Sequence, residues 1–302
     1  MNKYFILILF LYLLPYLFYR SVSHGLGHKA EYLQMRRFLP CAILAVLPIY
    51  LANISLSEPL FLTSFVIGLS WIVTYPLFYF FTYRKNSSDF GFHFDIVFGL
   101  YIIAWLTSLK ILVITFNLLP FFFLSLISIL EFLIFLIPFT QWIYYYLYCS
   151  CITEDGMIMI QETNYNEIIE FFKQFSFIFN LLIFSLLLSI FTIFIALNLT
   201  FSPIYLSLLN SSIIFAITVF LTYYLWKNGE NEKKQGVFVR TGIIELFFDV
   251  KKYIQTTFLY KDNMQKRIKD LIVTPDKPQF DKPSTIIMVI GESESRDYMS
   301  AF

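Results

Sequence analysis

Seven long apolar runs constrain this chain more than any other feature of its sequence. Crossing the hydrocarbon core of a bilayer takes about 20 mainly apolar residues. The runs lie at approximately 4–19, 38–56, 60–83, 96–119, 121–148, 176–197 and 203–226. Only 14% of the residues are charged, against about a quarter in a soluble domain. The sequence therefore predicts an α-helical polytopic membrane domain over residues 1–226, with about five to seven spans, and excludes a soluble globule.

The first apolar run allows two interpretations. It is short, contains Pro15, follows Lys3 and precedes the small residues at 21–23, as a cleaved signal peptide would. Its apolar core slightly exceeds the usual length of such peptides, which favours a retained membrane anchor.

The charged residues divide the chain after Trp226. Residues 1–226 hold 9 Lys+Arg and 10 Asp+Glu, whereas residues 227–302 hold 13 and 11 in a much shorter stretch. We therefore expect a juxtamembrane segment over 227–274, and over 275–302 a linker and the start of a domain in water. The net charge of +1 gives no reason to expect a nucleic-acid partner, which calls for a concentrated basic face.

Two ionisable residues, Lys110 and Glu131, lie inside apolar runs, where they are costly unless paired or facing a cavity. Residues 117–120 have the character of a turn, and Lys110 and Glu131 lie ten and eleven residues from Pro120. An antiparallel hairpin would therefore place both side chains at nearly the same depth. We predict a Lys110–Glu131 pair, and we favour a structural pair that fixes helix register over a proton or substrate path.

The hydrophilic end carries two patterns. Apolar residues recur at helical spacing over 237–260, which indicates an amphipathic helix lying on the bilayer or packed in a soluble domain. After a proline-rich linker at 274–284, the apolar run 286–290 is typical of a buried strand. It is followed by Gly291 and Glu292. A carboxylate directly after a buried strand is well placed to hold a metal.

These features together resemble the bacterial phosphoethanolamine transferases that modify lipopolysaccharide, and more closely the branch that acts on the lipopolysaccharide core. The resemblance is carried by ETNYNE at 162–167 with EF at 170–171, two further spans, a surface helix, and VIGESESR at 289–296. It extends over about residues 150–302. The earlier spans are similar only in hydrophobicity.

The resemblance implies a membrane-anchored member of the alkaline-phosphatase/sulfatase-like superfamily with a zinc-dependent α/β domain, of which this chain holds the first strand. Such enzymes move phosphoethanolamine from phosphatidylethanolamine to a threonine and then to a lipopolysaccharide acceptor. Glu292 corresponds to a zinc ligand of the family. Thr163 and Glu167 correspond to positions that contact the donor headgroup, and on one helix they would share a face. The alternative for Thr163 and Glu167 is helix capping.

The family's threonine nucleophile and its Asp-His zinc ligands come well after the Gly-Glu motif, whereas this sequence ends at Phe302. No catalytic residue is therefore assigned, and one carboxylate cannot supply the ligands that zinc needs. We expect an amino-terminal, truncated transferase that is inactive as written. The alternatives are a relative of the phosphoglycerol transferases and a non-catalytic polytopic membrane protein.

The orientation in the membrane has conflicting indications. With seven spans, the basic loops 20–37 and 84–95 share a side with 149–175 and with the hydrophilic end. The positive-inside rule would place that side in the cytoplasm. The resemblance implies a protein of the bacterial inner membrane with its carboxyl-terminal end in the periplasm. We expect this periplasmic orientation, because the transferase site should face its glycolipid acceptor.

Overall fold

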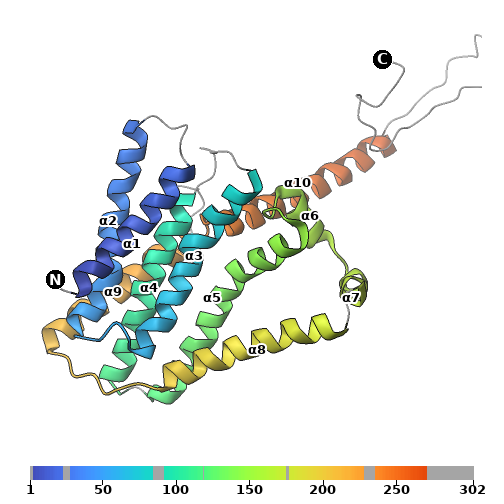
Figure 1. The fold of residues 1–302 in the computed structure, drawn as a ribbon. Coiled ribbons are helices and arrows are strands. Elements are labelled where there is room, and N and C mark those ends of the chain that lie inside the picture. The colour runs from blue at the N-terminus through green and yellow to red at the C-terminus, as the bar shows by residue number, and fades with distance from the viewer. Residues whose placement is uncertain are drawn as a thin grey trace, which may run out of the picture. The chain divides into compact units, whose positions relative to one another are not determined.

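The computed structural model describes residues 3–22, 28–83, 92–117, 119–174, 177–227 and 235–270. Within these ranges the chain forms ten helices and no strand (Figure 1). The helices are α1 (Lys3–Val22), α2 (His28–Leu51), α3 (Pro59–Tyr83), α4 (Phe92–Thr115), α5 (Pro120–Tyr148), α6 (Glu154–Glu162), α7 (Tyr165–Gln174), α8 (Phe177–Leu199), α9 (Leu208–Trp226) and α10 (Gly242–Asp270). The predicted strand at 286–290 and Glu292 lie outside the described residues.

Within the described ranges, five helices are long and apolar enough to cross a membrane. These segments are Pro59–Phe78, Phe94–Thr115, Pro120–Tyr148, Leu181–Leu199 and Leu208–Trp226. The first two predicted runs correspond to shorter apolar segments in the described residues, Lys3–Leu14 of α1 and Phe38–Leu51 of α2. The prediction of a multi-pass helical membrane domain is confirmed at this level, and five of its seven runs meet the length needed for a span.

The turn at 117–120 separates α4 from α5, as predicted. Asn117 and Leu119 adopt positive φ angles of 49° and 38°, a conformation that reverses the chain direction after a helix. Pro120 then occupies the first turn of α5, where its missing N–H costs no hydrogen bond. Residues 96–148 therefore form two antiparallel helices rather than a single crossing.

Helix α4 lies at the centre of the bundle, where it packs against α2, α3, α5 and α9. Its closest approach is to α3, through Gly68 and Gly99. A Cβ atom on Gly68 would lie 2.6 Å from the carbonyl oxygen of Gly99, and a Cβ on Gly99 would lie 2.6 Å from that of Gly68. Small residues at facing positions let two helix backbones approach closely, which is a common way of packing helices in membranes.

One end of the bundle gathers the α2–α3, α4–α5 and α8–α9 connections; we call it the Glu58 end. The Tyr4 hydroxyl donates to the Ile54 carbonyl at 2.9 Å. The Asn210 side chain donates to the Leu51 carbonyl at 3.0 Å. The rings of Phe121 and Phe201 lie 5.6 Å apart.

The opposite end, which we call the tail end, holds α6, α7 and the start of α10. Residue Cys151 follows α5, and its N–H donates to the Thr82 hydroxyl near the end of α3 at 3.2 Å. The Gln161 side chain of α6 donates to the Phe247 carbonyl of α10 at 2.9 Å. The connection from α5 to α8 and the start of the hydrophilic end therefore share one side, as the count of spans predicted.

The chain divides into two compact units, Met1–Gln255 and Thr256–Phe302. The first unit holds α1 to α9 and the start of α10. Of the second unit, the structure describes the end of α10, to Asp270.

Candidate functional site

The structure brings Lys110 of α4 and Glu131 of α5 into contact inside the helix bundle. The Lys110 ammonium forms an ion pair with the Glu131 carboxylate, and both side chains have no exposed surface. The contact predicted from the depth of the two residues is therefore present. It lies near the Glu58 end, because Lys110 also donates to the carbonyl of Leu60, in the first turn of α3, at 3.0 Å.

Four further side chains, those of Thr63, Ser64, Ser128 and Asn198, complete a cluster that we call the buried polar cluster. The Lys110 ammonium donates to the hydroxyls of Thr63 at 2.5 Å and Ser64 at 2.9 Å. The Asn198 amide of α8 donates to the second carboxylate oxygen of Glu131 at 2.5 Å. Oxygen Oε1 of Glu131 also lies 3.3 Å from each of the two hydroxyls. The cluster therefore joins α3, α4, α5 and α8.

Every charged atom of the cluster already has a protein partner. An ammonium has three protons to donate, and Lys110 has four acceptors within reach. Buried charges are tolerated when they are paired and fully hydrogen-bonded. Because the hydrogen bonds of both charged groups are already made within the protein, neither group is free to bind a ligand. The geometry therefore favours a structural pair that fixes the register of the helices over a proton or substrate path.

Thr163 and Glu167 lie at two different helices, so the shared face that one continuous helix would give them is not formed. Thr163 ends α6, where its hydroxyl donates to the Met159 carbonyl at 2.5 Å. Glu167 lies in the first turn of α7 and accepts a hydrogen bond from the Asn164 backbone N–H at 3.2 Å. In a capping box, the side chain of an acid three residues after the N-cap residue accepts a hydrogen bond from the backbone N–H of that N-cap residue. Glu167 and Asn164 form this half of the motif. Asn164 therefore starts a new helix between the two residues.

Helix α7 is amphipathic, and its apolar side is exposed. Tyr165, Ile168 and Phe172 expose 75%, 43% and 52% of their surface, and their spacing of three and four residues places them on one side. Glu167 and Glu170 are exposed as well. The α6–α7 segment connects α5 and α8, two helices that are long and apolar enough to cross a membrane (Figure 1). An amphipathic helix beside such a span can bury its apolar side at a bilayer surface.

The amphipathic helix predicted over 237–260 is present as α10, from Gly242 to Asp270. One stripe packs onto the protein itself: Ile243 and Val250 are buried against Tyr75, Cys151 and Met157. Phe247, Phe248 and Tyr253 remain exposed on the same helix, and the stripe that α10 buries packs on the helix bundle rather than in a separate soluble domain.

The two cysteines after α5 have different surroundings. Cys149 is exposed, whereas Cys151 is buried beneath α10. Burial raises the pKa of the Cys151 thiol to about 11, although a hydrogen bond with the Thr82 hydroxyl partly opposes this rise. A group with so high a pKa stays protonated and unreactive at neutral pH.

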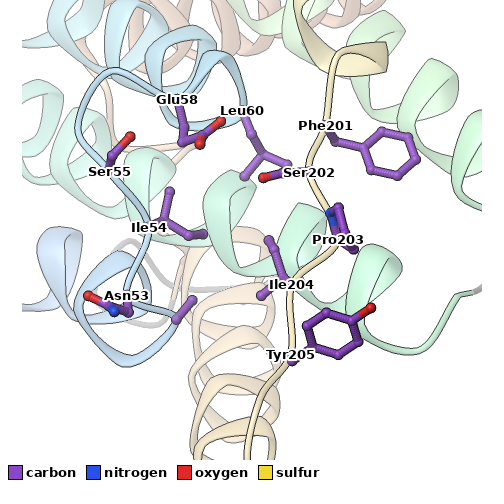
Figure 2. Close-up of a pocket in the computed structure, with 11 residues that line it drawn as sticks. Asn53, Ile54, Ser55, Glu58, Leu60, Phe201, Ser202, Pro203, Ile204 and Tyr205 are labelled. Carbon is purple, nitrogen blue, oxygen red and sulfur yellow. The ribbon is translucent and has the colours of Figure 1, made fainter.

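A pocket of about 370 Å³ opens at the Glu58 end between the α2–α3 and α8–α9 connections (Figure 2). Its lining includes the polar residues Asn53, Ser55, Glu58, Ser202 and Tyr205. The remaining lining residues are mainly apolar. The sequence alone does not indicate this pocket, because its two walls are more than 140 residues apart in the chain and only the fold brings them together.

The described residues contain no group of three or more His, Cys, Asp and Glu that could hold a metal. Glu292 lies outside those residues, and a single carboxylate does not provide the three or four protein ligands of a zinc site. The described part of the chain therefore does not fit a zinc centre, and we derive no chemical step through zinc.

The described residues form an α-helical fold with five helices long and apolar enough to cross a membrane, which is compatible with a multi-pass membrane protein. No protein family, no curated protein and no solved structure matches the chain.

Proposed function

We propose that this chain is the membrane part of a phosphoethanolamine transferase of the inner membrane. In this proposal it binds phosphatidylethanolamine at the tail end and presents the headgroup to the hydrophilic region that follows α10. Lipopolysaccharide is the proposed acceptor, and the tail end is proposed to face the periplasm. The observation that carries the proposal is the position of the α6–α7 segment, which lies outside the spans at the same end as the start of α10.

Glu167 is the residue that we propose to receive the ethanolamine ammonium. Its carboxylate is exposed and accepts bonds from the Asn164 backbone and side chain at 3.2 and 3.4 Å. A carboxylate has about four lone-pair positions, so the capping bonds leave room for an ammonium donor. Thr163 is a weaker candidate for headgroup binding, because its hydroxyl proton is already donated to the Met159 carbonyl.

A zero-length carbodiimide coupling tests this assignment. The reagent joins a carboxylate to an amine only when the two are in contact. We expect the full chain, in bilayers that contain phosphatidylethanolamine, to form a lipid amide at Glu167 that peptide mass spectrometry detects. Glu170, exposed one turn later on the same helix, serves as the matched control. Modification of Glu167 no greater than that of Glu170 would contradict the proposal.

A conservative variant separates binding from folding. Glu167→Gln keeps an acceptor for the Asn164 N–H, because glutamine also completes a capping box, but it removes the charge. We expect Glu167→Gln to retain less phosphatidylethanolamine through purification than Glu170→Gln, with unchanged helicity by circular dichroism. Equal retention of phosphatidylethanolamine by the two variants would contradict the assignment of Glu167.

A further inference from the structure

We propose that the pocket at the Glu58 end binds the ammonium-bearing headgroup of a membrane lipid. This site is separate from the proposed donor site, because the two lie at opposite ends of the bundle. The proposal does not rest on the proposed function.

The position of the pocket places it among lipid headgroups. Its walls adjoin the start of one span at Pro59, the end of another at Leu199 and the start of a third at Leu208. Hydrocarbon therefore ends at the level of the pocket. Next to it, Leu208 and Phe121 expose 89% and 66% of their surface, as expected of side chains in contact with lipid.

The charge of the pocket selects a cation. Glu58 is the one carboxylate among the lining residues, which include no Lys, Arg or His. The structure gives the Glu58 side chain no hydrogen bond or ion pair in the described part of the chain. Figure 2 shows the carboxylate turned towards the second wall, where Ser202 lies. An unpaired carboxylate in a partly enclosed space is a partner for an ammonium group.

The remaining polar groups suit a zwitterionic headgroup better than a metal ion. One carboxylate falls short of the six to eight oxygen ligands that calcium takes. Asn53 and the hydroxyls of Ser55, Ser202 and Tyr205 supply hydrogen-bond donors. These donors can bind a phosphate next to the ammonium. An anionic lipid without an amine would instead meet the Glu58 charge and be repelled.

Carbodiimide coupling in nanodiscs tests the proposal with the intact chain. We expect a phosphatidylethanolamine amide at Glu58 and none in bilayers of phosphatidylglycerol. Glu154, an exposed acid at the start of α6, reports background coupling. Ser202→Phe fills the pocket and should lower the coupling at Glu58 about tenfold, while coupling at Glu167 stays unchanged.

Two results would overturn the assignment. Coupling at Glu58 that is no greater than at Glu154 would show that no ammonium headgroup occupies the pocket. Equal coupling of free ethanolamine, in bilayers that lack amino lipids, would show a site for small amines rather than for a lipid. Glu58→Gln provides a non-covalent check, because loss of a charge-assisted bond should weaken phosphatidylethanolamine retention about tenfold.

Discussion

The backbone N–H of Gly242, the first residue of α10, donates to both carboxylate oxygens of Asp95, at 3.1 and 3.3 Å. Asp95 lies in the first turn of α4 and is 1% exposed. An acid from one helix thus satisfies an N–H at the amino terminus of another, where a negative charge is also favoured by the helix dipole. This contact ties the start of α10 to the central helix of the bundle.

Replacing Asp95 should loosen the start of α10. Asp95→Ala removes the acceptor of the Gly242 N–H, and loss of such a cap costs about 1 kcal/mol. We expect faster hydrogen–deuterium exchange over residues 242–248, measured by mass spectrometry in nanodiscs. Asp95→Asn keeps one acceptor oxygen and should show a smaller change. Equal exchange in Asp95→Ala and the unaltered protein would show that the contact does not hold the helix.

Breaking the ion pair should destabilise the membrane domain strongly. Glu131→Leu leaves the Lys110 ammonium buried without its counter-charge, and such a change costs about 3–5 kcal/mol. We expect Lys110→Met to have an effect of similar size, and the double variant to lose less than the sum. Unfolding in bicelles, followed by steric trapping, measures these free energies. Ser125→Ala, on an exposed part of α5, is the matched control.

The exchanged pair, Lys110→Glu with Glu131→Lys, tests both the attraction between the two charges and the fit of each charge to the polar groups around it. Two mutually attracting charges are retained, so the exchange should be less harmful than either single reversal. Recovery should be incomplete, because position 110 also faces the Leu60 carbonyl, which can accept from an ammonium but gives nothing to a carboxylate. Strictly additive single and double effects would show that the two residues are not coupled.

Only one of the three cysteines should react with N-ethylmaleimide at pH 7. Cys149 is exposed, whereas Cys41 and Cys151 are buried. The thiolate is the reactive form. The pKa of Cys151, raised to about 11, keeps it as the thiol until the pH approaches that value. Peptide mass spectrometry should find the adduct on Cys149 alone, and on all three after denaturation in detergent. Rapid labelling of Cys151 in the folded protein would contradict its burial under α10.

The glycine contact between α3 and α4 should not tolerate a larger side chain. In Gly99→Ala the new methyl group would meet the Gly68 carbonyl oxygen at 2.6 Å, and backbone atoms cannot move aside as a flexible side chain can. Forced overpacking of this kind costs about 1–3 kcal/mol. Loss of monodisperse protein on heating in detergent measures the effect. Thermal behaviour like that of the Ser125→Ala control would show that the helices can separate at low cost.

The ion pair could be predicted because charge is costly in lipid and because the turn at Pro120 fixed the depth of both residues. Its neutral partners could not. Thr63, Ser64 and Asn198 are common enough in spans to attract no attention, and their role depends on which helices become neighbours. Asn198 is 67 residues from Glu131 in the chain, so only the packing of α8 on α5 identifies it.

Thr163 and Glu167 do not form the shared face that one helix would give them, for a reason that the sequence already contained. Asn164 followed three residues later by Glu167 is a helix-start pattern, and it marks a boundary between the two residues. The length of α10 was underestimated in a different way. Its polar end continues the helix to Asp270 without the apolar periodicity on which the prediction relied.

The buried polar cluster has a consequence for how the protein is made. During synthesis, α4 and α5 each bring one charge of the pair into the membrane, and a charge in a lone inserted helix costs up to about 2.5–3.5 kcal/mol, the value at the helix centre. Entry of the two helices as one hairpin, with the charges already neutralising each other, avoids most of this penalty. Asn198 leaves the ribosome much later than Glu131, so final assembly around the carboxylate must await the arrival of α8.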